Sequence, residues 1–305
     1  MNKAKTIRAV ILAAATTAWA NESPIPLVEE TRVSTNADGV IRAQTIERVP
    51  LKDGQYAPWR TTHSVTREIK PGLTETVRNI VQTSLQGQPA QTIQSTQTRE
   101  KTADTEILRT TEITTNAFGK VADVRIIEET TQRQPDGSLL VRVAEQGRNV
   151  HGEMTFQQEQ QRRIQTISPT DTQMETRIRS FDHLRGRIDE TAVQTTRVHT
   201  EKEIIRAETI TRRTVGDQDR LVGRSISTET RKSDGSWQRE TIEYGPGLYD
   251  RLTPPGSGEL QPKRKIIERY TQQPDGSHQR IREVFRCDLN GEWKPMPFGW
   301  AGDQP

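Results

Sequence analysis

Apolar and polar residues alternate along most of this chain, with the period of a β-strand rather than of a helix. The pattern is clearest in residues 266–284, where two alternating runs flank the sequence Gln-Pro-Asp-Gly-Ser at 273–277. Proline presets the second turn position, aspartate suits the third, and glycine takes the left-handed conformation that closes a hairpin. Pairing outward from this turn predicts the cross-strand pairs Tyr270–Arg280, Glu268–Arg282, Ile266–Val284, Arg269–Ile281 and Ile267–Glu283.

A second hairpin repeats this arrangement around the turn Ser-Asp-Gly-Ser at 233–236. Its predicted pairs are Arg231–Trp237, Glu229–Arg239, Ile226–Ile242 and Arg224–Tyr244. Neither hairpin has a face that is apolar throughout. Cross-strand ion pairs and cation–π contacts contribute from a few tenths to about 1 kcal/mol each. Many weak contacts of this kind could therefore replace one large apolar core.

Turn signals recur at regular intervals, and most successive gaps span 15 to 19 residues, the length of one strand and a short turn. Two longer gaps indicate turns without glycine near residues 102–104 and 200–202. We therefore expect about 15 to 18 strands, and short turns can join only antiparallel neighbours. The predicted fold is all-β, a long antiparallel up-and-down meander of repeated β-hairpins. In residues 187–215 a helix competes, but β-branched residues favour strands.

Composition limits how this sheet can be stabilised. Only 30% of the 305 residues are hydrophobic, whereas about 45 to 50% of a typical globular domain is apolar. We expect an elongated or curled sheet with a small apolar core. Balanced charge with few apolar residues is also typical of poorly ordered chains, but the abundance of Thr, Val and Ile favours an ordered sheet. A lipid-facing barrel is disfavoured, because its strands need one continuously apolar face.

The first 20 residues are typical of a secretory signal peptide: a basic start, a short apolar run and the small-x-small sequence Ala18-Trp19-Ala20. An uncleaved anchor is the alternative, although the run is too short to span a bilayer. The predicted organisation is a signal peptide at 1–20, a repetitive β-meander at 21–244, a Pro/Gly-rich loop or linker at 245–262, and C-terminal β-hairpins with a tail at 263–305.

Cleavage of the signal peptide would change the net charge. The chain has 44 Lys+Arg and 41 Asp+Glu, and residues 1–20 hold three of the basic residues and no acidic one. The remaining chain would be formally neutral, so the basic pI of the full sequence does not indicate nucleic-acid binding. The best local basic run is 263–265, which a solvated strand edge explains better than a polyanion site.

The sequence offers little catalytic chemistry. The five histidines are scattered, without the spacing of a metal site, and the chain has no nucleophile elbow and no phosphate-binding glycine loop. A carboxylate pair for glycoside hydrolysis leaves no fixed spacing in a sequence. Cys287 is the only cysteine, so no intramolecular disulfide can form. It either pairs with another chain or, as we expect, packs opposite Trp293 in a hairpin around 290–291. We predict no catalytic residue, no metal and no cofactor.

These observations favour an exported, non-catalytic structural or interaction protein in the periplasm, at the cell surface or outside the cell. Unpaired strand edges would bind a second copy or another envelope protein. The alternative is a carbohydrate-binding or carbohydrate-active envelope protein. Its rings would have to share one face and flank a carboxylate. The candidate contact residues are Tyr56, Trp59, Trp237, Tyr244 and Trp293. A third possibility is a sheet curled around a lipid, which needs a continuous apolar inner face.

Overall fold

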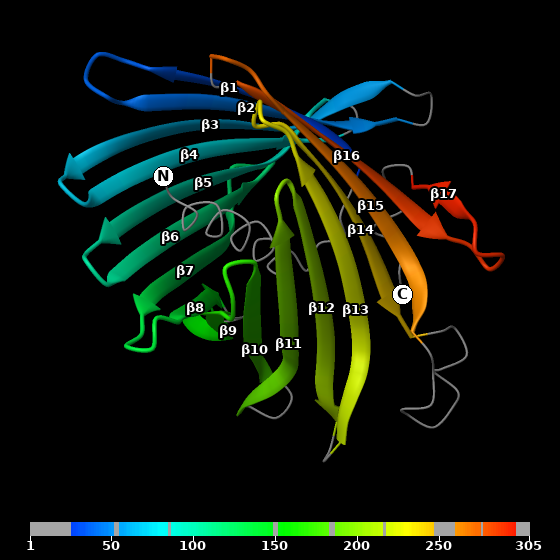
Figure 1. Ribbon diagram of the computed structural model, residues 1–305. Helices are drawn as coiled ribbons and strands as arrows, with labels where there is room; N and C mark the ends of the chain where they lie inside the picture. Colours follow the sequence, from blue (N-terminus) through cyan, green and yellow to red (C-terminus); the bar gives the residue numbers. More distant parts are fainter. Residues whose placement is uncertain are drawn as a thin grey trace.

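The strands form a closed barrel (Figure 1). The computed structural model describes residues 26–51, 55–84, 87–148, 152–182, 187–215, 218–246, 260–275 and 277–296. The predicted signal peptide, most of the predicted linker and the last nine residues lie outside them. The strands are β1 (Leu27–Thr35), β2 (Ile41–Pro50), β3 (Tyr56–Lys70), β4 (Leu73–Thr83), β5 (Pro89–Lys101), β6 (Thr105–Asn116), β7 (Val121–Arg133), β8 (Leu139–Arg148), β9 (Met154–Thr166), β10 (Asp171–Asp182), β11 (Arg187–Glu201), β12 (Ile204–Val215), β13 (Gln218–Arg231), β14 (Trp237–Gly245), β15 (Gln261–Gln272), β16 (His278–Cys287) and β17 (Trp293–Pro295).

Each strand pairs antiparallel with the next one in the chain, so the predicted all-β meander is confirmed. The described strands number 17, within the expected range. Closure comes from β1, whose residues Leu27 to Thr31 pair with Arg282 to His278 of β16. The sheet is therefore closed, and the elongated alternative with unpaired edges along its long strands is wrong.

The far edge of β16 is shared by two strands. Its first half pairs with β1, and its last residues, Phe285 to Cys287, pair with the short β17. Both partners run antiparallel to β16, so they point in the same direction along one edge. The backbone N–H of Met296, just after β17, donates to the carbonyl of Val284 at 2.8 Å. β17 and β1 therefore lie one after the other along the same edge of β16.

The cross-strand pairs predicted from the two turns are confirmed, residue for residue. Cys287 also lies opposite Trp293, as predicted. The two turns predicted without glycine occur, one of them with Lys202 at a φ of 51°. Residues 187–201 and 204–215 are strands, so β-branching outweighs the helical signals there. Pairing of β14 with β15 continues the sheet across the predicted linker.

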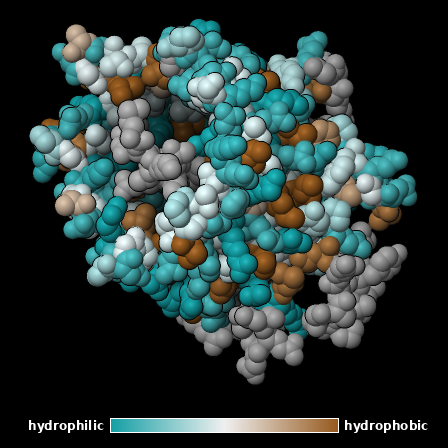
Figure 2. Space-filling view, in the orientation of Figure 1, coloured by the Kyte–Doolittle hydropathy of each residue, from teal (hydrophilic) through white to brown (hydrophobic). Residues whose placement is uncertain are grey.

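The two faces of the wall differ in burial. Every described strand side chain that is buried lies on one face, and the opposite face contributes only partly or fully exposed side chains. Side chains converge on the concave face of a closed sheet and diverge on the convex one. We therefore assign the buried set to the inner face. Figure 2 shows the polar and apolar side chains intermixed on the visible surface.

The apolar core is small, as composition predicts. Its larger cluster lies on the inner face of β7 to β10 and contains Val141, Val143, Ile164 and Met174, with Ile127 and Leu139 packed against it. A second cluster pairs Val198 with Ile205. The other buried strand residues include five more apolar side chains, five threonines and the ion-paired acids Glu47, Glu229 and Glu268. Cross-strand Thr–Thr hydrogen bonds, such as Thr31 to Thr45 at 2.8 Å, supplement this limited apolar burial.

Register shifts interrupt eight of the strand pairings. Such bulges bend a strand and increase its local twist. A long meander of twisted strands uses this extra curvature to bring β1 back to β16.

Candidate functional site

The most densely charged part of the inner face is an inner charge cluster formed by Glu229, Arg239, Glu268, Arg280 and Arg282. Glu229 and Glu268 are only 3% and 4% exposed. Arg239 pairs with both carboxylates, lying 3.6 Å from Glu268 and closer to Glu229. Arg280 and Arg282 also donate to Glu268, the latter over 3.0 Å. The cluster thus links β13, β14, β15 and β16 by contacts between ionised groups.

The charged pairing continues across the closure of the barrel. Glu29 of β1 lies opposite Arg280 of β16 and also opposite Glu47 of β2. The Arg60 guanidinium of β3 donates to both oxygens of Glu47 at 2.8 and 2.9 Å. A continuous row of acids and bases therefore runs through the point where the sheet closes.

The pKa values of two buried acids of this row are shifted in opposite directions. Burial opposes ionisation of Glu268, but the charges of Arg280 and Arg282 outweigh it, and the pKa of Glu268 lies below its ordinary value. At Glu47 burial dominates over its partner Arg60, the nearby charge of Glu29 adds to burial, and the pKa is raised. Glu268 is therefore the strongly held carboxylate of the two.

An aromatic stack adjoins the inner charge cluster near the hairpin ends. Trp237 and Tyr270 are parallel, with ring centroids 5.5 Å apart, and Tyr270 lies 5.2 Å from the His278 ring. The Arg239 guanidinium lies 4.9 Å from the Trp237 ring centroid. These rings cover the hairpin ends and pair across strands, a structural role for large side chains beside a tight turn.

The five predicted contact residues do not share one face. Trp237 is on the inner face, whereas Tyr244, opposite Arg224, is on the outer face. Trp293 is also on the outer face, where the Lys265 amine lies 5.5 Å from its ring. Tyr56 begins β3 and is half exposed, and Trp59 sits at a register shift with Arg60 over its ring. The structure therefore does not bring them together as one aromatic groove.

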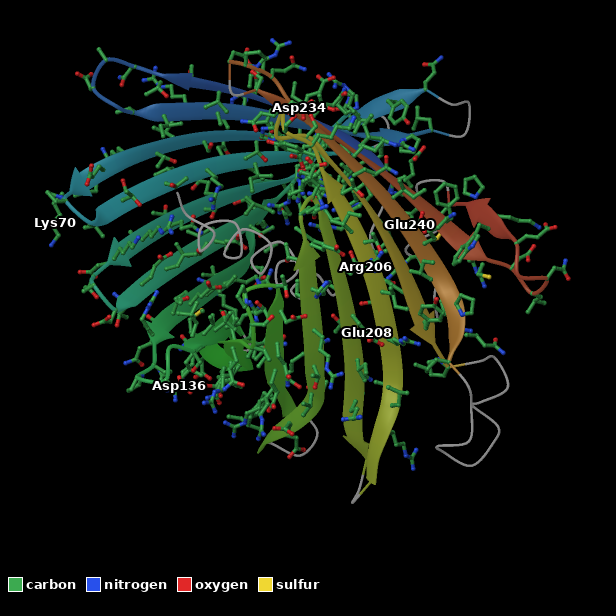
Figure 3. The ribbon with its side chains drawn as sticks, in the orientation of Figure 1. Lys70, Asp136, Arg206, Glu208, Asp234 and Glu240 are labelled. Carbon is green, nitrogen blue, oxygen red and sulfur yellow. The ribbon has the colours of Figure 1, made fainter. Side chains whose placement is uncertain are left out.

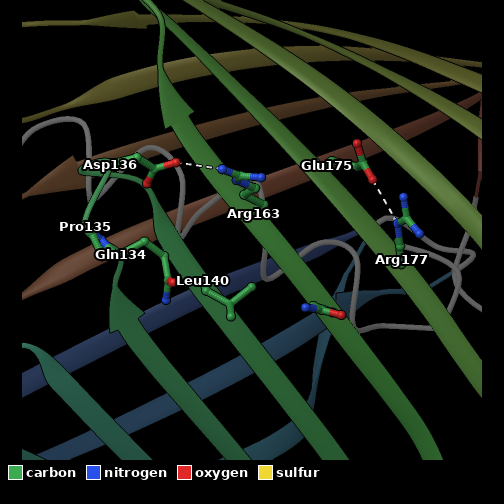
Figure 4. Close-up of a pocket in the computed structure, with 8 residues that line it drawn as sticks. Gln134, Pro135, Asp136, Leu140, Arg163, Glu175 and Arg177 are labelled. Carbon is green, nitrogen blue, oxygen red and sulfur yellow. Dashed lines mark hydrogen bonds and ion pairs between the residues drawn. The ribbon is translucent and has the colours of Figure 1, made fainter.

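Two shallow grooves lie along the outer face. The first, of about 630 Å³, runs from the turn after β7 across β8 and β9 to β10 (Figure 4). Its arginines are already paired: Arg163 donates to Asp136 at 2.6 Å, and Arg177 to Glu175 at 2.9 Å. Hydrogen bonds from Ser138 and Arg163 lower the pKa of Asp136 to about 2. This groove offers a neutral surface of satisfied ion pairs.

The second groove, of about 550 Å³, crosses β10 to β13. Asp171 accepts a hydrogen bond from the Nδ1 of His199 at 2.8 Å and others from Ser168 and Thr170. The bonds from Ser168, His199 and Thr170 lower the pKa of Asp171 to about 2, so this carboxylate stays ionised. An ionised carboxylate can only accept, which fixes the Nδ1 proton on His199.

Sequence reasoning did not find the second groove. Part of the groove could have been found in the sequence: Arg197 and His199 are two residues apart on a predicted strand, so they share a face, and a turn is predicted directly after them. Placing Arg206 opposite His199 required the exact turn length, which no glycine marked.

Among the described residues, no group of three or more His, Cys, Asp or Glu side chains is arranged to hold a metal ion. Within the same part of the chain, no helix is long and apolar enough to cross a membrane. No model of a known protein family and no curated protein matches this chain.

Proposed function

We propose that this protein is an exported, non-catalytic structural or interaction protein of the cell envelope or the extracellular space. The observation that carries the proposal is the inner charge cluster. Its buried carboxylates are neutralised by arginines from neighbouring strands, so these carboxylates stabilise the contacts between the strands. The product is a closed scaffold whose outer face is mixed in character and available to partners.

Closure changes the proposed route to a partner. Strand-edge pairing needs an unpaired edge, and β1 and β16 pair with each other over five residue pairs. In the described part of the chain, the short β17 has only β16 as a neighbour. We therefore propose the outer face as the principal contact surface, with edge pairing restricted to β17.

Export is tested by producing the full chain in a bacterial host and sequencing the N-terminus of the product in each cell fraction. The proposal expects a product outside the cytoplasm that begins at Asn21, because cleavage follows Ala18-Trp19-Ala20. Retention of the uncleaved chain in the cytoplasm would contradict it. A variant with Ala18→Lys should block cleavage, since the site requires small residues.

The interaction role is tested by placing a photo-crosslinking residue at exposed outer-face positions such as Arg142 and Glu240 in the exported protein. We expect a defined crosslinked product from the outer face and none from an inner-face position such as Thr176, which is 2% exposed. Equal labelling of both faces would argue that the barrel is open in solution.

Carbohydrate binding is the second candidate, favoured by the half-exposed ring of Tyr56 and the partly exposed ring of Trp293. The test is co-sedimentation with insoluble polysaccharides, with Tyr56→Ala and Trp293→Ala as variants. Saturable sedimentation that both substitutions abolish would favour this candidate over the purely structural role.

A further inference from the structure

The second outer-face groove contains two arginines that have no partner among the described residues. Arg197 on β11 and Arg206 on β12 are both exposed and line the groove. Neither forms an ion pair or a side-chain hydrogen bond with any described residue, although most of the described arginines are paired. Figure 3 shows Arg206 and Glu208 following one another along β12.

The strand register explains why these two arginines stay unpaired. Glu208 lies directly opposite Arg197, but its carboxylate accepts from Arg224 of β13 at 2.7 Å. Arg206 lies directly opposite His199, not an acid. The other carboxylate that lines the groove, Asp171, accepts from His199, Ser168 and Thr170. Both carboxylates that line the groove therefore already accept hydrogen bonds from other residues. Arg197 and Arg206 have no partner among the described residues.

His199 is the third polar side chain on this side of the groove. Its Nδ1 is held by Asp171, and its Nε2 has no hydrogen-bond partner among the described residues. Directly opposed residues on one face of an antiparallel pair have Cβ atoms about 4.5 to 5.5 Å apart, and diagonal or next-but-one neighbours about 7 Å. Arg197, His199 and Arg206 therefore form a triangle small enough to surround one tetrahedral anion. The two guanidinium groups donate to it, and His199 donates from Nε2 in its imidazolium form, because Asp171 already accepts from Nδ1.

We propose that this groove binds a phosphate monoester through Arg197, His199 and Arg206. Guanidinium groups bind phosphate oxygens in a bidentate manner, and a phosphate monoester carries about −1.5 to −2 charges near neutral pH, which matches two arginines better than a carboxylate does. The apolar side chains of Ile167 and Ile226 at the groove would contact the body of the ligand. This site is independent of the export and scaffold proposals, since it rests on the groove alone.

Binding is measured by titrating the full chain with glucose 6-phosphate while following the ring C–H resonances of His199 by NMR, which His199→Gln assigns. We expect a saturable shift that glucose does not produce. Inorganic phosphate should compete, and acetate should compete at least about tenfold more weakly because it offers less charge. Vesicles containing phosphatidic acid form a separate arm: competition by them would assign the monoester to a lipid, and its absence to a soluble ligand.

Matched variants separate a built site from diffuse positive charge. Arg197→Gln and Arg206→Gln should each weaken binding at least about tenfold, because each removes a charge-assisted contact. Arg212→Gln, on the same strand and face as Arg206 but outside the groove, should leave binding unchanged. If Arg212→Gln weakens binding as much as Arg206→Gln, or if the titration never saturates, the proposal is wrong. Far-UV circular dichroism confirms that each variant is folded.

Asp171→Asn gives the sharpest test. It removes a negative charge from the groove, so simple electrostatic attraction predicts tighter binding. The proposal predicts severalfold weaker binding, since His199 loses the acceptor that orients its ring. Binding that is unchanged or tighter in Asp171→Asn would show that His199 is not a positioned donor and would overturn its assigned role.

Discussion

At the scale of single residues, the stability of the wall depends on a few carboxylates that neutralise several arginines at once. Glu268 holds Arg239, Arg280 and Arg282, and its side chain is only 5% exposed. Removing the acid leaves positive charges facing one another in a poorly hydrated place. Loss of one partner of a buried pair is far more costly than loss of an exposed pair.

Glu268→Gln should therefore lower the free energy of unfolding by about 3 kcal/mol, because three arginines lose their common anion. Urea denaturation followed by circular dichroism measures the change. Glu240→Gln is the matched control: Glu240 is exposed on the outer face of β14, and its loss should cost less than about 0.5 kcal/mol. Equal costs for the two variants would show that the inner charge cluster does not stabilise the barrel.

The pH dependence of stability should distinguish Glu268 from Glu47. The pKa of Glu268 is depressed in the folded state, so its contribution is present above the unfolded value of about 4.3 and is lost as the pH falls below it. The pKa of Glu47 is raised, so its contribution has the opposite sign and is lost as the pH rises through its folded value. Urea denaturation between pH 3 and 7 should show a shallower acid loss in Glu268→Gln and a steeper one in Glu47→Gln.

Only part of this cluster was predictable. The turns at 233–236 and 273–277 fix the registers that place Arg239 opposite Glu229 and Arg282 opposite Glu268. The contact between Arg239 and Glu268 joins two hairpins that are separated by residues 246–260. No short turn sets the register across such a segment, so the sequence could not predict how the two halves of the cluster combine.

At the scale of elements, the tight turns determine which residues face one another. Asp136 shows the mechanism: it accepts hydrogen bonds from the backbone N–H and the hydroxyl of Ser138, at 2.9 and 2.6 Å. Between them Gly137 has a φ of 78°, and no other atom lies within 4 Å of the point that a Cβ would occupy. The requirement for glycine there is conformational, since there is room for a side chain.

Gly137→Ala should lower the free energy of unfolding by about 1 kcal/mol, because an L-residue is disfavoured at this positive φ. Gly137→Asn should cost less, since asparagine tolerates the left-handed region. Thermal and urea unfolding of both variants measure the difference. A larger cost for asparagine, the bulkier residue, would indicate that space and not backbone conformation is limiting.

At the scale of the whole molecule, closure is the feature that the sequence did not specify. Local alternation and turn spacing predict that neighbours in the chain are neighbours in the sheet. The pairing of β1 with β16 joins residues near the two ends of the chain, and no local signal marks it. It follows from accumulated twist and from bulges, whose positions the residue pattern does not reveal.

Closure predicts that cysteines at Val28 and Ile281, which lie directly opposite each other, form a disulfide within one chain. The experiment uses a Cys287→Ser background and measures the oxidised product by non-reducing electrophoresis and mass spectrometry. The control pairs Val28→Cys with Arg269→Cys on β15, two strands away and about 10 Å apart, which is too far for a disulfide. Formation of only intermolecular dimers by the first pair would mean that β1 and β16 are apart in solution.

The shared edge of β16 has a further consequence for chain connectivity. Met296 lies beside Val284, Leu27 lies beside Arg282, and β17 and β1 run in the same direction. A linker of about one residue would therefore fuse them into one uninterrupted strand. A circular permutant that joins Met296 to Leu27 and opens at the exposed tip near Phe118 should fold to the same barrel.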